Sequence, residues 1–267
     1  MPAHHIVISL RASIGRDRET TRRVVGALLR GGRGAPLVAF HLSDGHVHVL
    51  ALLDRVASGR VAQRLGVALR AVLGDILEPA QFTLVRDQTH LARTFEYILR
   101  NDEKHGVEPD PWRENGALPD LLGLRDVDSE LLRTVRRVLP RVHGSDLRAM
   151  AGWPEFDVVA SNDGVADAAA AALALPALTG RRAAVVAARR AIVTMFPAVS
   201  AVSLAQALGV SREGVRVLRG SPPARPELVR AIGLQIALRS AVPLPAEGAF
   251  STVGARLAWP ERRRVLR

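Results

Sequence analysis

The stretch PLVAFHLSDGHVHVLALL, residues 36–53, contains two apolar runs separated by Ser43-Asp44-Gly45. Ser, Asp and Gly are common in tight turns, because they form local hydrogen bonds or tolerate positive φ angles. Two β-prone runs joined by so short an insert predict an antiparallel hairpin. The other elements of this half can be predicted outward from the hairpin.

The segments on both sides of the hairpin predict the fold class. HIVISLRA (5–12) alternates as a strand does, and residues 16–31 have helical spacing with a charged outer face. After the hairpin, residues 55–73 carry an apolar helical stripe, and QFTLVRD (81–87) is a further strand. The order β-α-β-β-α-β predicts an α+β, ferredoxin-like arrangement, an antiparallel sheet with helices on one face.

The sequence also predicts a second domain. A further helix is expected over 88–103, and residues 105–125 are then rich in Pro, Gly and Asn. We place a domain boundary there, with a first domain over 1–125 and a second over 126–267. Every element predicted in the second domain is helical, and the chain ends in a basic tail, ERRRVLR (261–267).

The charge of the chain favours a polyanionic partner. The 267 residues carry a formal net charge of +11, and the basic charge is almost all arginine, because Lys104 is the only lysine. The planar guanidinium binds phosphate through paired hydrogen bonds, and nucleic acid is the commonest polyanion. A GC-rich genome would also favour arginine over lysine, but it would not explain the net charge.

The composition excludes several kinds of site. There is no cysteine, which rules out disulfides, thiol catalysis and cysteine-ligated metals. No apolar run of about 18 residues occurs, and the N-terminus lacks a signal-peptide pattern. We therefore expect a cytoplasmic, nucleoid-associated protein with no membrane partner, in which any metal has nitrogen and oxygen ligands.

The hairpin carries a pair of histidines in its second strand. Residues two apart in a strand point to the same face, so His46 and His48 project side by side, whereas Val47 and Val49 point to the other face. Two imidazoles that converge on one spot are candidate metal ligands. A pair of strand histidines without a ligand has the same pattern.

The only tyrosine, Tyr97, lies in the helix predicted over 88–103. At about 100° per residue, one side of this helix is apolar. The opposite side carries Tyr97 together with His90, Arg93, Asn101 and Lys104. This placement predicts a hydroxyl close to positive charge, with the Asn101 amide one turn along the same face. An ordinary surface tyrosine on a basic helix would fit the same pattern.

These segments resemble a known family. GHVHVLAL (45–52) resembles the HUH motif, histidine-hydrophobic-histidine. YILRNDEKHGV (97–107) resembles the Tyr-x-x-x-Asn helix of the IS200-like Y1 transposases, most closely the REP-associated tyrosine transposases. LPDLLGLR (118–125) is similar to the segment that follows in that subgroup. The resemblance covers residues 1–125 and implies an antiparallel sheet with flanking helices.

The resemblance also implies a chemistry. His46 and His48 correspond to metal ligands, Asn101 to the third ligand and Tyr97 to the nucleophile. The implied activity is a metal-dependent single-stranded DNA endonuclease and strand transferase, with a 5′-phosphotyrosine intermediate and a single-stranded or hairpin substrate. Mg²⁺ or Mn²⁺ suits such ligands, and Mn²⁺ matches imidazole better.

Two further features concern DNA contact in the first domain. Arg93 and Lys104 are expected to bind DNA and to favour the phenolate form of the tyrosine. Family members often have Asn immediately before the first histidine, where this chain has Gly45. The grip on DNA or the choice of substrate is therefore expected to differ.

The segment VSLAQALGVSREGVRVL (202–218) has the pattern of a helix-turn-helix. Gly209 stands at the turn, and Ser211 is the expected N-cap of the second helix. Ser211, Arg212 and Arg216 are the residues expected to contact duplex DNA. This half is similar to the DnaA-like C-terminal domain of some relatives, and any small helical hairpin would share part of the pattern.

Three functions fit these patterns. The transposase-like enzyme is favoured because all four chemical positions are intact. A domesticated, non-catalytic DNA-binding protein or regulator is the alternative. A ferredoxin-like RNA-binding module is disfavoured, because an aromatic content of 4% leaves few rings for stacking on bases.

Overall fold

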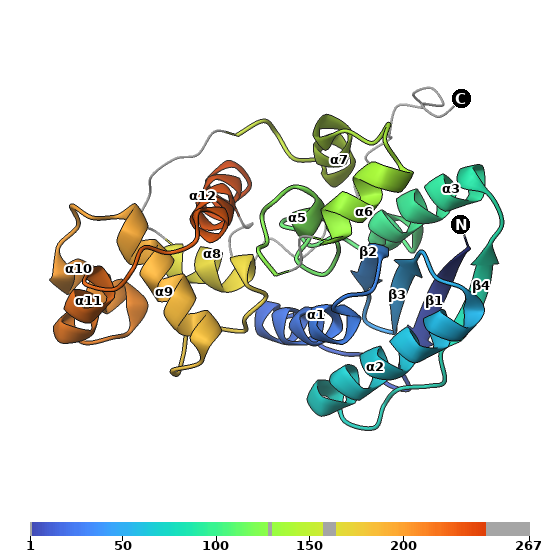
Figure 1. Ribbon diagram of the computed structural model, residues 1–267, viewed down its shortest axis with the longest axis horizontal. Helices are drawn as coiled ribbons and strands as arrows, with labels where there is room; N and C mark the ends of the chain where they lie inside the picture. The colour runs from blue at the N-terminus through green and yellow to red at the C-terminus, as the bar shows by residue number, and fades with distance from the viewer. Residues whose placement is uncertain (1, 128–129, 157–163, 244–267) are drawn as a thin grey trace.

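The computed structural model describes residues 2–127, 130–156 and 164–243 (Figure 1). Its first half contains a four-stranded antiparallel sheet in the order β2-β3-β1-β4. The strands are β1 (Ala3–Ser9), β2 (Leu37–Leu42), β3 (His46–Ala51) and β4 (Gln81–Val85). The helices among and after them are α1 (Arg18–Gly32), α2 (Arg55–Leu73), α3 (Gln88–Leu99), α4 (Asn101–Lys104) and α5 (Leu118–Leu121). The predicted α+β order and the antiparallel sheet are confirmed.

The second half of the described chain is built from helices. They are α6 (Glu130–Val138), α7 (Gly144–Ala151), α8 (Val165–Ala172), α9 (Ala183–Met195), α10 (Ala201–Leu208), α11 (Arg212–Arg219) and α12 (Pro226–Ala241). No strand is assigned within residues 130–156 or 164–243. The basic tail at 261–267 lies outside the described residues.

An aspartate caps the N-terminus of each of the first three helices. The side chain of Asp17 accepts a hydrogen bond from Thr20 N at 2.9 Å at the start of α1. Asp54 and Asp87 cap α2 and α3 in the same way. Such a cap satisfies an amide that has no partner inside the helix. The sequence therefore marks where these helices begin.

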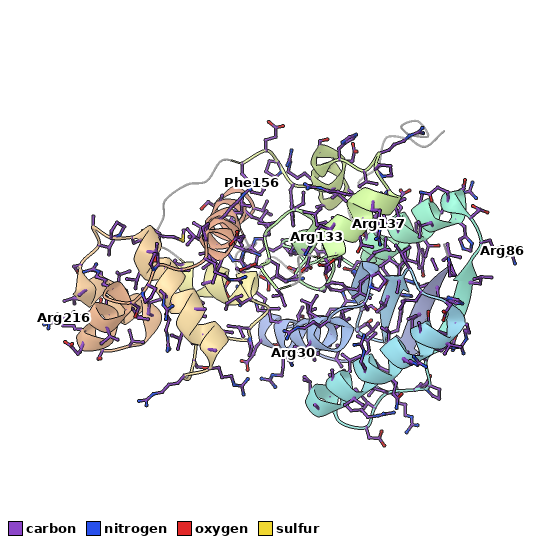
Figure 2. All side chains as sticks on the ribbon, in the orientation of Figure 1. Arg30, Arg86, Arg133, Arg137, Phe156 and Arg216 are labelled. Carbon is purple, nitrogen blue, oxygen red and sulfur yellow. The ribbon has the colours of Figure 1, made fainter. Side chains whose placement is uncertain are left out.

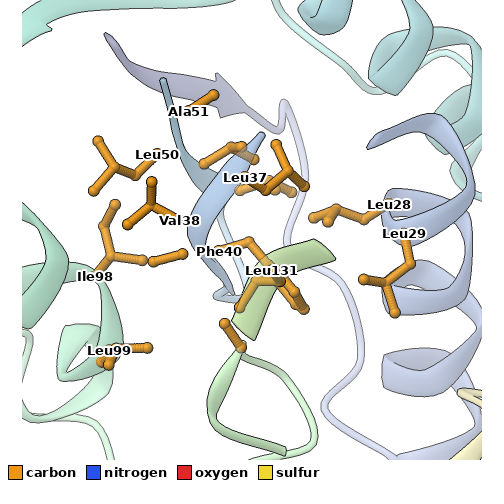
Figure 3. Packing of buried hydrophobic residues seen from close by; sticks show 14 of the residues in the cluster. Leu28, Leu29, Leu37, Val38, Phe40, Leu50, Ala51, Ile98, Leu99 and Leu131 are labelled. Carbon is orange, nitrogen blue, oxygen red and sulfur yellow. The ribbon is translucent and has the colours of Figure 1, made fainter. Parts of the chain in front are cut away.

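The two helices of the predicted β-α-β-β-α-β unit, α1 and α2, pack together on one face of the sheet, and the additional helix α3 covers the other face. On one face α2 lies over β4, with the Arg55 guanidinium 3.7 Å from the centre of the Phe82 ring. On the other face α3 packs against β2 and β3. In Figure 3, Leu28 of α1 and Ile98 of α3 lie on opposite sides of Phe40 in β2. The second layer arises because α3 has an apolar side, which includes Phe95 and Ile98, and this side is buried against β2 and β3.

The buried apolar residues form two clusters. The first cluster includes the sheet, and it extends to Leu131 of α6, Leu147 of α7 and Leu238 of α12. The second cluster involves residues of α8 to α12, from Val165 to Ile236. Residues 112–125, expected near a linker, are mostly buried. The domain boundary at 125 stays a prediction, and α6 and α7 pack with the sheet.

A buried ionic network joins α1 to the C-terminal helices. Glu114, 2% exposed, accepts hydrogen bonds from Arg22 of α1 and Arg239 of α12. Both guanidinium groups also bind Asp167 of α8, with Arg22 Nη1 2.7 Å from its Oδ1. The Arg239 guanidinium lies 4.2 Å from the centre of the Trp112 ring. These contacts hold the two halves together in the described residues.

None of the described helices has the combination of length and apolar character needed to cross a lipid bilayer. Figure 2 shows arginine side chains at the surface of well-separated elements, with Arg30 and Arg216 labelled far apart. The basic charge is therefore distributed over both halves rather than confined to the tail.

Candidate active site

One face of the sheet carries histidines from three strands. His48 of β3 pairs with His41 of β2 on one side and with Val7 of β1 on the other. Residues paired directly across neighbouring strands point to the same face, and so do residues two apart in one strand. His5 and His46 therefore share this face with His41 and His48. The predicted pairing of His46 with His48 on one face is confirmed.

Helix α3 brings Tyr97 over this face. The ring centres of Tyr97 and His48 are 5.7 Å apart, and those of His46 and His48 are 4.4 Å apart. The Tyr97 hydroxyl lies 3.5 Å from Nε2 of His105, whose ring is 5.8 Å from that of His46. Tyr97 is half-buried rather than freely exposed. The tertiary structure thus places the single phenol among four histidines.

The central histidine of this group, His48, is neutral and almost fully buried. Burial is the main cause that lowers its pKa, to about 2, and neighbouring histidines lower it further. Burial also lowers the pKa of His5 to about 4 and that of His46 below its ordinary value. Neutral imidazoles carry a lone pair that a metal ion can bind. Within the described chain, Nε2 of His48 is buried and has no hydrogen-bond partner.

The helix predicted over 88–103 is interrupted just before Asn101, and the role predicted for Asn101 as a metal ligand stays a prediction. Helix α3 ends at Leu99, Arg100 has φ −111° and ψ 28°, and Asn101 begins the short α4. Asn101 is 0% exposed, whereas Tyr97 is half-buried. Neither polar atom of the Asn101 side chain has a hydrogen-bond partner among the described residues.

A buried polar contact anchors α4 beside the histidine face. Nε2 of His41 lies 3.1 Å from Oδ1 of Asp102, and both side chains are buried. The Asn115 side-chain amide donates to the other Asp102 oxygen at 3.0 Å. Because Asp102 follows Asn101 directly, this contact holds Asn101 next to β2, the strand in which His41 pairs with His48 of β3.

The donor set fits a divalent cation. Nε2 of His48 and Oδ1 of Asn101 are buried acceptor atoms without partners, and an unmet buried polar atom costs about 1–3 kcal/mol. Two imidazole nitrogens and an amide oxygen are ligands that Mn²⁺ or Mg²⁺ accepts. No three His, Asp or Glu side chains gather as a metal site in the described ranges. The Asn101 amide is the third ligand that the sequence predicted, and this role stays a prediction.

Two other site residues predicted in the first half, Arg93 and Lys104, lie near Tyr97 in the sequence. Within the described residues, no hydrogen bond joins either of them to the Tyr97 hydroxyl. Arg93 and Lys104 are both exposed. Their predicted DNA contacts stay predictions.

His5, His41 and His105 lie at the site but were not predicted from the sequence. One signal could have identified them: seven of the eight histidines precede residue 106. Adding the strand register of the hairpin would have placed His41 opposite His48.

The segment 202–218 folds as two helices joined at Gly209, whose φ is +60°. The Ser211 hydroxyl accepts from Gly214 N at 3.0 Å, so the predicted N-cap is confirmed. Leu204, Leu208 and Val215 are buried, and Leu218 is partly buried against the same cluster. Arg212 and Arg216 are exposed on α11. This geometry presents two guanidinium groups on one short helix.

Comparison with known proteins gives one weak likeness. No family model matches the sequence, and no curated protein does. A solved structure of a REP-associated tyrosine transposase bound to a REP hairpin is 18% identical, with a TM-score of 0.30. The match covers 40% of this chain and 69% of that chain. A likeness of this size carries no argument about activity.

Proposed function

We propose that this chain is a metal-dependent single-stranded DNA endonuclease and strand transferase that uses Tyr97 as its nucleophile. The observation that carries the proposal is the convergence of Tyr97, His46 and His48, with ring centres 4.4–5.7 Å apart between successive members. Nε2 of His48 and Oδ1 of Asn101 are both buried, and neither has a hydrogen-bond partner among the described residues. A phenol, two neutral imidazoles and a buried amide together form a set suited to phosphodiester transfer.

The reaction follows from the chemistry of these groups. The Tyr97 oxygen would form a bond to phosphorus while the bond from phosphorus to the 3′ oxygen breaks. The phenol proton leaves, and the departing 3′ oxygen takes up a proton. A divalent cation, when bound, polarises the phosphate and neutralises developing charge. His46, His48 and Asn101 would hold it, and Tyr97 would keep the DNA attached through a 5′-phosphotyrosine.

The experiment that tests this function is a search for the covalent adduct. The full chain is incubated with Mn²⁺ and a pool of single-stranded and hairpin oligonucleotides, and a denaturing gel is examined for protein joined to DNA. An adduct supports the enzyme. If DNA and Mn²⁺ both bind and no strand is cut, the non-catalytic DNA-binding regulator is the better hypothesis.

Replacing His46 or His48 by alanine is expected to abolish metal-dependent cleavage. Each change removes one of only two imidazole ligands, which lowers metal affinity. Cleavage and Mn²⁺ binding are measured side by side, with duplex binding as the readout that should persist. His143→Ala, at the exposed start of α7, is the matched control. Cleavage by His46→Ala at the parent's rate would contradict the metal-site assignment.

The helical half is proposed to bind duplex DNA through α11. Arg212 and Arg216 are exposed there, and Figure 1 places α10 and α11 at the opposite end of the molecule from the sheet. Arginines on the second helix of such a pair bind phosphates or guanine edges. A duplex held at this end leaves the histidine face for a single strand. Duplex binding through α11 would also be expected of the non-catalytic DNA-binding regulator.

Arg212→Ala and Arg216→Ala are each expected to weaken duplex binding. The loss is about 1–3 kcal/mol for an arginine that contacts a base, and it is uniform across sequences for one that contacts phosphate. Binding is measured at several salt concentrations, because the loss of a phosphate contact lowers the salt dependence of duplex binding. Arg30→Ala, at an exposed position of α1, is the control. Unchanged binding by the double variant would exclude α11 as the duplex-binding helix.

A further inference from the structure

His5 and His48 form a direct contact between their rings. His5 Nε2 lies 2.9 Å from His48 Nδ1, and the two rings are stacked, with centres 5.1 Å apart and planes inclined by 27°. The contact follows from the sheet register, because His48 pairs with Val7 and His5 stands two residues before Val7 on the same face. The hydrogen bond therefore joins β1 to β3 on the side that faces Tyr97.

One proton lies between these two nitrogens. The ring that carries it determines the tautomer of His48, and with it what His48 can bind. A neutral imidazole has one N–H and one lone pair. If His48 Nδ1 carries the proton and donates to His5, the lone pair of His48 is at Nε2. If His5 donates instead, the His48 proton is at Nε2.

The surroundings of His48 Nε2 favour the first arrangement. This nitrogen is buried, and no acceptor for an N–H is found for it in the residues the structure describes. A lone pair at the same place would be satisfied by a divalent cation, whereas an N–H would repel one. Metal-bound histidines in proteins usually donate their other N–H to a neighbouring group, which sets the tautomer and ring orientation.

We propose that His5 is a positioning residue that accepts the Nδ1–H of His48 and so directs the His48 Nε2 lone pair toward a divalent cation. This inference rests on the proposed metal-dependent function and adds a residue to it. His5 does not bind the metal or the DNA in this scheme. It fixes the form in which His48 can do so.

The first test measures the tautomer in the metal-free parent protein. Long-range ¹H–¹⁵N NMR distinguishes the two neutral forms of an imidazole, and the His48→Gln variant assigns the His48 signals. The expected result is His48 protonated at Nδ1. A His48 ring protonated mainly at Nε2 would overturn the inference. This measurement needs no activity and no variant of His5.

The second test measures Mn²⁺ affinity by titration calorimetry. His5→Phe keeps a stacked ring and removes the accepting nitrogen, and we expect it to bind Mn²⁺ about 10–100-fold more weakly. His5→Gln retains an acceptor oxygen and is expected to lie closer to the parent. The matched control is His4→Phe, because His4 Nδ1 binds Leu53 O at 2.9 Å on the opposite face. His4→Phe should bind Mn²⁺ with the parent's affinity even if it lowers the stability of the fold.

The outcomes separate the two claims. If His5→Phe binds Mn²⁺ as the parent does while His48→Ala loses it, the role of His5 is refuted and the metal site stands. If the parent binds no Mn²⁺, the metal site itself is refuted, and with it the role assigned to His5. If His5→Phe is too unstable to titrate, the comparison of His5→Gln with the parent and the tautomer measurement decide the role.

Discussion

Tyr97→Phe is expected to reduce DNA cleavage and adduct formation to below detection. The substitution removes one oxygen and keeps the ring that packs beside His5 and His48. Folding, Mn²⁺ binding and DNA affinity should therefore change little, while the nucleophile is lost. The measurement is a denaturing gel with oligonucleotides labelled at the 3′ end, because a 5′-phosphotyrosine retains the downstream strand.

Because the chain has a single tyrosine, this test assigns the site of the adduct without ambiguity. The sequence has only one tyrosine, so a phosphotyrosine can form only at Tyr97. Peptide mapping of the parent adduct should find the nucleotide on the segment that contains it. If the phenylalanine variant cuts at the parent's rate, water is the nucleophile and the strand-transferase proposal fails. Equal Mn²⁺ binding by the two proteins is the control for an intact site.

Glu114→Ala is expected to be the most destabilising of the substitutions considered, at about 3–5 kcal/mol. Glu114 is 2% exposed and binds the guanidinium groups of both Arg22 and Arg239. Arg22 Nη2 donates to it at 2.9 Å. Removing the carboxylate leaves two buried guanidinium groups whose remaining carboxylate hydrogen-bond partner, among the described residues, is Asp167. A buried charge that loses a partner is costly.

The measurement is urea unfolding of the parent and the variant. Glu213→Ala is the matched control, because its contact with Arg216 on α11 is exposed, at 70% and 71% for the two side chains. Exposed pairs contribute about 0–1 kcal/mol, so the control should unfold near the parent's midpoint. A loss below 1 kcal/mol for Glu114→Ala would show that the network does not hold the two halves together.

Local patterns allowed much of the fold to be predicted, because they depend on neighbouring residues. The turn at Ser43-Asp44-Gly45 closes as expected, with Ser43 N donating to His46 O at 3.0 Å. Period-two alternation placed His46 and His48 on one face, and the Ser211 cap marked the start of α11. Each of these features needs only a few consecutive residues and the geometry of a strand, turn or helix start.

The sequence by itself therefore determined the order of the elements, the shared face of His46 and His48, and the uniqueness of Tyr97 as a phenol. Only the tertiary structure decided what surrounds them. Asn101 is buried at the start of α4, and His5 reaches His48 because β1 pairs with β3. Strand register and long-range packing join residues some 40 to 125 positions apart, as between His5 and His48 or Glu114 and Arg239. The free energy of these long-range contacts depends on burial and on the geometry of the partners in three dimensions. The spacing of neighbouring residues in the sequence does not encode either of them.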